Sequence, residues 1–130
     1  MTTITSRGIA AACDFYPKHI PDILFENDDT SFRPCDYSGI RYGSIVYVST
    51  GALTAWIDYL LDDLIKHEIK IVLVTGGSVV GLPRECSCIF KKDIYKLLEP
   101  VLLAWFTQNL DVPNVVKMYS IPIGLDFHHL

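Results

Sequence analysis

The stretch IVLVTGGS at residues 71–78 is a β-branched apolar run that ends abruptly in small and polar residues. Two other stretches repeat this pattern, IVYVSTG at 45–51 and IPIGLD at 121–126. Segments of helical character separate the three, which is typical of sheets whose strands run parallel. The carboxyl ends of such strands meet at one edge, where open α/β sheets bind their ligands. The sequence therefore predicts an α/β fold, a Rossmann-like open parallel sheet with flanking helices.

Length and composition indicate one globular domain over residues 1–130, with residues 1–44 largely irregular apart from a short strand near 23–25. Half of the residues are hydrophobic and 20% are charged, which is typical of a folded chain. The formal net charge is −4 and the 11 lysines and arginines are scattered, which argues against nucleic acid as a partner. The apolar segment 97–106 is too short to span a bilayer, and the N-terminus has no hydrophobic stretch of signal-peptide length. We expect a soluble, cytoplasmic protein without a membrane span.

The clearest predicted helix begins at Leu53 and runs to about Lys66. Its apolar residues recur at helical spacing and form one stripe: Leu53, Trp56, Ile57, Leu60, Leu61, Leu64 and Ile65. Ser49 or Thr50 is expected to cap its first turn.

Helical periodicity resumes at Lys91, is interrupted at Pro100, and is expected to continue to a C-terminal cap at Asn109. The stripe predicted for this second helix comprises Leu98, Val101, Leu102, Trp105 and Phe106. The third strand is predicted at 115–123. The two tryptophans of the chain lie in the two stripes and are both expected in the core.

The loop Thr75-Gly76-Gly77-Ser78 follows a predicted buried strand, and its glycines could bring backbone N–H groups close to a phosphate or a sugar. It matches neither the dinucleotide-binding pattern nor the P-loop pattern. The alternative is a turn in which glycine simply allows positive φ.

Three carboxylates stand beside predicted loops or strand ends: Asp14, Asp36 and Asp126. Any of them could act as a general base, although carboxylates at such positions also serve as turn and cap residues. The sequence leaves both roles open.

No metal site and no cofactor is expected. His128 and His129 are adjacent, and in an extended segment their side chains point in opposite directions, so one ion is rarely held by both. The four cysteines match no zinc or redox spacing and are expected to be thiols: Cys13, Cys35, Cys86 and Cys88.

Short pieces of sequence, spread over nearly the whole chain, carry a family resemblance: RGI at 7–9, CD at 13–14, VYVS at 46–49, LVTG at 73–76 with Pro83, WFTQN at 105–109, VK at 116–117 and IPIGLDFH at 121–128. In this order they resemble exostosin-like and related GT-B-type glycosyltransferases of algae and large DNA viruses. The chain departs from that pattern near Ser78, where the family often carries an acidic residue.

The resemblance implies the acceptor-side half of a GT-B architecture, truncated before the second Rossmann-like half that grips the nucleotide-sugar. It implies an acceptor glycan as ligand, with Asp14 and Asp126 as candidate catalytic carboxylates. The candidate substrate-binding residues lie at the predicted strand ends: Ser49, Thr75, Gly76, Gly77, Ser78 and Gly124. Transfer by this half alone is not expected.

Two other functions stay open. The chain could be a non-catalytic α/β interaction or structural module, because half an open sheet leaves an edge and an apolar face for a protein partner or a second copy. It could also be a small nucleotide-binding or hydrolytic α/β domain, a hypothesis that rests on fold analogy alone.

Overall fold

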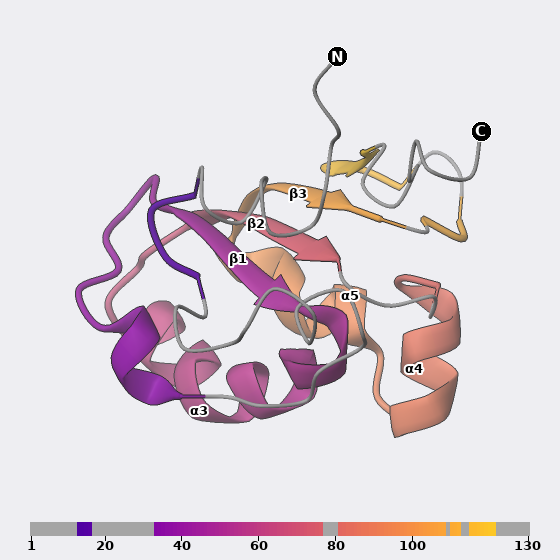
Figure 1. The fold of residues 1–130 in the computed structure, drawn as a ribbon, viewed down its shortest axis with the longest axis horizontal. Coiled ribbons are helices and arrows are strands. Elements are labelled where there is room, and N and C mark those ends of the chain that lie inside the picture. Colours follow the sequence, from indigo (N-terminus) through magenta and orange to yellow (C-terminus); the bar gives the residue numbers. More distant parts are fainter. Residues whose placement is uncertain (1–12, 17–32, 77–80, 109, 113–114, 122–130) are drawn as a thin grey trace, which may run out of the picture.

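Four parallel strands in the order β1-β2-β3-β4 form the sheet of this protein, which we describe from a computed structural model (Figure 1). The structure describes residues 13–16, 33–76, 81–108, 110–112 and 115–121. The strands are β1 (Ile45–Ser49), β2 (Ile71–Gly76), β3 (Leu102–Thr107) and β4 (Met118–Ser120). The predicted α/β fold with a parallel, Rossmann-like sheet is confirmed.

The helical elements are η1 (Pro34–Tyr37), η2 (Thr50–Ala52), α3 (Leu53–Lys66), α4 (Arg84–Phe90), α5 (Ile94–Leu98) and η3 (Glu99–Val101). Helices α3, α4 and α5 lie on one side of the sheet (Figure 1). None of the helices in the described part of the chain is long and apolar enough to cross a membrane.

Helix α3 has the boundaries that its apolar stripe predicts, but it begins differently. Ala52 is its N-cap, and no side chain caps the first turn, so the expected cap by Ser49 or Thr50 is wrong. Thr50 belongs instead to the short helix η2, which leads the chain directly from β1 into α3. At the other end of the stripe, Ile65 is exposed rather than buried.

The predicted helix from Lys91 to Asn109 is wrong in its second half. Only Ile94–Leu98 is α-helical, and after η3, which contains Pro100, the chain forms the central strand β3. The spacing of its apolar residues fits a helix, but Leu102–Thr107 is also a nearly continuous apolar run, which suits a strand enclosed between two neighbours. Asn109 itself lies outside the described residues.

The strand predicted at 115–123 is present as β4, but it is the fourth strand and pairs with β3 rather than with β2. It is the fourth strand rather than the predicted third, because β3, which was predicted as part of a helix, lies between it and β2. All the pairings are parallel, as predicted. The expected strand near residues 23–25 lies outside the described residues.

The outer edge of β1 is occupied. Phe15 forms a parallel bridge with Val46, the N–H of Asp14 donates to the carbonyl of Ile45 at 2.8 Å, and the N–H of Tyr47 donates to the carbonyl of Phe15 at 2.8 Å. Two residues of the N-terminal segment thus continue the ladder beyond β1. This segment lies within the part of the chain that was expected to be irregular.

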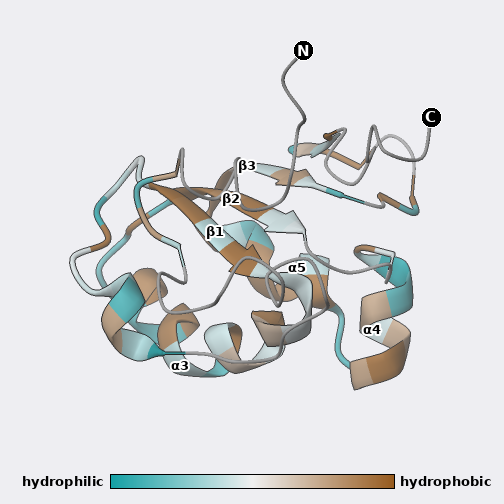
Figure 2. Cartoon of the chain, viewed as in Figure 1, coloured by the Kyte–Doolittle hydropathy of each residue, from teal (hydrophilic) through white to brown (hydrophobic). Residues whose placement is uncertain are grey.

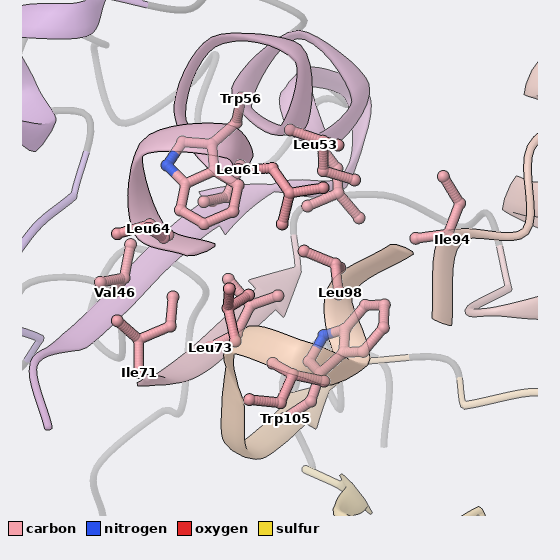
Figure 3. Packing of buried hydrophobic residues seen from close by; sticks show 14 of the residues in the cluster. Val46, Leu53, Trp56, Leu61, Leu64, Ile71, Leu73, Ile94, Leu98 and Trp105 are labelled. Carbon is pink, nitrogen blue, oxygen red and sulfur yellow. The ribbon is translucent and has the colours of Figure 1, made fainter. Parts of the chain in front are cut away.

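The main core lies between the sheet and the helices, on what we call the helix-covered face. Side chains of α3 point toward β1 and β2, and Leu98 of α5 lies near Trp105 of β3 (Figure 3). Trp56 and Trp105 both have 0% exposure, which confirms their predicted burial. In Figure 2 β1 and β2 are mostly brown, as expected for strands buried on both sides.

The other face of the sheet, which we call the opposite face, holds a second, smaller cluster. Tyr47 and Val74 form its buried part, and Cys13, Tyr16 and Phe106, together with Ile121, pack against them. Phe106 also stacks on Tyr119 of β4, with 5.1 Å between the ring centroids. Because side chains alternate along a strand, neighbours such as Trp105 and Phe106 belong to different clusters.

Candidate functional site

The carboxyl ends of the strands bring together three of the residues proposed from the sequence. Ser49 ends β1 and pairs in register with Gly76 at the end of β2, and Thr75 pairs with Thr107 at the end of β3. Ser49, Thr75 and Thr107 are all buried. The structure therefore places hydroxyl-bearing residues from three neighbouring strands at one edge of the sheet. Thr75 and Thr107 lie on the helix-covered face, and Ser49, which alternates with Val48, lies on the opposite face.

A chain of hydrogen bonds links this edge to the core. The indole N–H of Trp105 donates to Thr75 Oγ1 at 2.9 Å, and the Thr75 hydroxyl donates to Thr107 Oγ1 at 2.6 Å. The Thr107 hydroxyl donates in turn to the carbonyl of Gln108 at 3.0 Å. The carbonyl of Gln108 can only accept, so the single hydroxyl hydrogen of Thr107 is used there and the Thr75 hydroxyl must donate to Thr107.

On the β1 side of the same edge, Thr50 adds one hydroxyl to that of Ser49. Thr50 Oγ1 donates to the carbonyl of Gly76 at 3.4 Å, a long bond. The Ser49 side chain is 2% exposed, and its hydroxyl finds no hydrogen-bond partner in the described part of the chain. A buried hydroxyl without a partner costs free energy, and such a group is a natural contact for a ligand at the edge.

Asp14 is not part of this edge. Its carboxylate accepts a 2.8 Å hydrogen bond from the N–H of Ile45, the first residue of β1. It therefore lies at the amino end of β1, while Ser49 lies at the carboxyl end of the same strand. The structure does not bring Asp14 together with Ser49 and Thr75.

The remaining residues proposed for the site lie outside the described part of the chain: Gly77, Ser78, Gly124 and Asp126. His128 and His129, at which no metal is expected, lie outside it as well. Asp36 is described, and it lies in η1. Within the described residues no group of three or more His, Cys, Asp or Glu side chains could hold a metal ion.

A carboxylate that the sequence analysis missed organises the loops at this edge. Asp111 accepts hydrogen bonds from the N–H groups of Arg84 and Glu85, at 2.9 and 2.8 Å, and so caps the first turn of α4 from the loop after β3. Glu85 Oε1 accepts from the N–H of Gly81 at 2.6 Å. A Cβ at Gly81 would lie 2.5 Å from Asp111 Oδ2, so glycine is what allows this close approach.

The same contacts join the loops that follow β2 and β3. Leu82 and Leu110 form a parallel bridge, and the N–H of Asp111 donates to the carbonyl of Leu82 at 2.9 Å. The sequence signal that could have found this link is a glycine and an acidic residue placed after successive strands. The sequence alone does not reveal the link, because Arg84 and Asp111 are 27 residues apart in the chain.

The four cysteines are present as thiols, as expected, and they differ in exposure. Cys35 and Cys88 are exposed, Cys86 is buried, and Cys13 is half-buried. Burial, with a smaller contribution from the neighbouring Asp14 carboxylate, raises the pKa of Cys13 from 9.0 to about 11. Cys13 is therefore almost entirely protonated at neutral pH.

Comparison with known proteins gives no match: no protein-family model, no curated protein and no solved structure is significantly similar to this chain.

Proposed function

We propose that this chain is a glycosyltransferase-related α/β domain that binds an acceptor glycan at the carboxyl edge of its sheet. The observation that carries the proposal is the convergence of Ser49, Thr75 and Gly76 at that edge, with Thr50 and Thr107 beside them. Ligands of open α/β sheets bind at this edge. The resemblance of the sequence to GT-B-type enzymes supports a sugar as the ligand.

The chemistry of the edge suits a polyol. Hydroxyl side chains can both donate and accept hydrogen bonds, as sugar hydroxyls do. Ser49 has an uncommitted hydroxyl within the described residues, and Gly76 lets a ligand approach the backbone without a side chain in the way.

In this proposal the domain contributes acceptor binding, and a separate unit holds the nucleotide-sugar. Asp126 is the proposed general base, because it follows the third motif of the sequence that ends in small and polar residues. Asp14, at the amino end of β1, would act elsewhere if it acts at all.

The test uses Ser49→Ala, because removing this hydroxyl breaks no hydrogen bond in the described structure. The purified chain is screened against an array of neutral and acidic oligosaccharides, and the best binder is titrated against the wild type and the variant. Loss of one hydrogen bond to the ligand should weaken binding by about three- to tenfold. The control is Ser38→Ala, at an exposed hydroxyl outside the strands, which should leave binding unchanged.

Two outcomes contradict the proposal. One is a folded chain that binds none of the oligosaccharides. The other is clear turnover of UDP- or GDP-sugars by the purified chain that Asp126→Asn abolishes, since the donor-side chemistry would then reside in this domain.

A second candidate function is a non-catalytic interaction module, and the opposite face favours it. No helix of the described part covers that face, and the stacked pair of Phe106 and Tyr119 leaves Tyr119 52% exposed. Exposed aromatic side chains are typical of protein-binding surfaces. A chain that binds no glycan but loses a protein partner on Tyr119→Ser would establish this function instead.

A further inference from the structure

A groove of about 690 Å³ runs between α3 and α5, in the helical layer and away from the carboxyl edge of the sheet. We call it the α3–α5 groove. Its apolar lining comes from Ile57 and Leu61 of α3 and from Leu97 of α5. Ile57 and Leu61 are buried at the base, and Leu97 is 37% exposed, so an apolar surface is open to an incoming group.

The two walls of the α3–α5 groove carry opposite charges. Asp58 and Asp62 line it from α3, and they stand one helical turn apart on the same side of that helix. Lys92 and Lys96 line it from the other wall, again four residues apart, together with Asp93, whose carboxylate accepts a hydrogen bond from the N–H of Lys96. The groove therefore carries two negative charges along one side and a net charge of one positive along the other.

Of the acidic and basic side chains that line the groove, only Asp58 and Lys92 form an ion pair. Lys92 Nζ lies 3.1 Å from Asp58 Oδ1, and both side chains are well exposed, so this surface pair contributes at most about 1 kcal/mol and can open. Asp62 and Lys96 have no side-chain hydrogen bond or ion pair in the described structure, although they line the same groove. An acid and a base thus remain available on opposite walls.

We propose that the α3–α5 groove binds an amphipathic helix of a protein partner, with basic residues along one flank of its apolar stripe and acidic residues along the other. A trough between two helices accepts a third helix, whose stripe can contact the apolar lining. The flanks then meet charges of opposite sign on both walls. Segments with like charges on both flanks would meet repulsion on one wall, so the charge pattern selects the partner.

The groove shares no residue with the carboxyl edge of the sheet. This inference therefore stands or fails independently of glycan binding.

The first experiment measures binding of three synthetic helical peptides of about four turns, a length at which isolated helices become stable. They share one leucine stripe and differ only in its flanks: lysine on one side and glutamate on the other, glutamate on both sides, or lysine on both sides. Fluorescence anisotropy with the full chain should show the bipolar peptide binding at least about tenfold more tightly than either of the others. Equal binding of all three peptides, or no binding of the bipolar one, overturns the proposal.

The second experiment changes the sign of one charge on each wall. Asp62→Lys and Lys96→Glu should each weaken binding of the bipolar peptide by about three- to tenfold. The double variant should weaken it at least as much as either single variant, because Asp58 and Lys92 keep their signs and each wall then carries mixed charges. The control is Asp63→Lys, an exposed position on α3 that does not line the groove.

Asp62 and Lys96 make no side-chain contact that the fold depends on, so all these variants should keep the circular dichroism spectrum of the wild type. Binding that the single reversals leave unchanged places the peptide elsewhere and overturns the assignment to the groove.

Discussion

The helix-covered face and the opposite face of the sheet are formed by the same strands but are packed in different ways. The helix-covered face contacts α3 and α5 and encloses both tryptophans, whereas the opposite face buries only Tyr47 and Val74 fully among the described residues. The free energy that burial contributes to folding increases with the apolar area that is removed from water. The comparison indicates that, among the described residues, stability resides mainly on one face.

The unequal contribution of the two faces to stability is tested most directly by truncating two adjacent residues whose side chains point to opposite faces. Trp105→Ala should lower the free energy of unfolding by about 3–5 kcal/mol, because it leaves a large cavity on the helix-covered face. It also removes the donor of the bond to Thr75 Oγ1. Urea unfolding followed by circular dichroism measures the loss.

The matched variant is Phe106→Ala, next in sequence and half-buried on the opposite face. Its cost should be about 1–2 kcal/mol, since less apolar area returns to water. Equal losses for the two variants would show that the faces contribute equally and that the comparison is wrong.

An effect smaller than that of Trp105→Ala is expected from the hydrogen-bonded hydroxyls at the end of the helix-covered face. Thr107→Val keeps the shape of the side chain but leaves the buried Thr75 hydroxyl without its acceptor, which should cost about 1–3 kcal/mol. Ser120→Ala is the control, because Ser120 is the exposed register partner of Thr107 on β4. Urea unfolding should separate the two variants, and a loss from Ser120→Ala as large as that from Thr107→Val would count against a special role for the buried hydroxyls.

The smallest perturbation is chemical labelling of the thiols, which reports how well the opposite face protects Cys13 without disturbing the fold. Because burial raises the pKa of Cys13 to about 11, its thiolate fraction at pH 8 is about a hundredfold below that of a thiol with the pKa of 9.0. Alkylation of Cys13 should therefore be slow at pH 8 and accelerate about tenfold per pH unit toward pH 11. Mass spectrometry with iodoacetamide should find Cys35 and Cys88 modified first and buried Cys86 last. Rapid modification of Cys13 at pH 8 would mean that the opposite face shields its residues less than the structure indicates.

Local sequence patterns predicted those elements whose apolar residues fit only one kind of secondary structure. The stripe of α3 fits only a helix, and the β-branched runs of β1 and β2 fit only buried strands. The segment from Leu102 to Thr107 fits both, because a central strand and a buried helix are apolar all round. Pro100, just before it, marked the change, but proline also fits the first turn of a helix.

Helix α4 was missed for a different reason, which also limits prediction of the candidate site. The sequence of α4 has no apolar stripe, and its first turn is stabilised by Asp111, a residue from a loop more than twenty positions away. The convergence of Ser49, Thr75 and Gly76 followed from the strand ends alone. The position of Asp14 did not, because its contact with the start of β1 depends on how the N-terminal segment returns to the sheet.

The bridge between Phe15 and Val46 has a consequence for how copies of this domain could associate through their sheets. Residues 14 and 15 take up the carbonyl of Ile45 and the N–H of Tyr47 on the outer edge of β1, while β4 has no neighbour beyond it among the described strands. A sheet with two open edges can add strands indefinitely, as in fibrils, but a sheet with one open edge cannot. If two copies pair β4 with β4 about a two-fold axis, each β4 supplies the backbone hydrogen-bond partners of the other. The joined sheet then has no open edge to which a further strand could add, so edge pairing of this domain would terminate at a dimer.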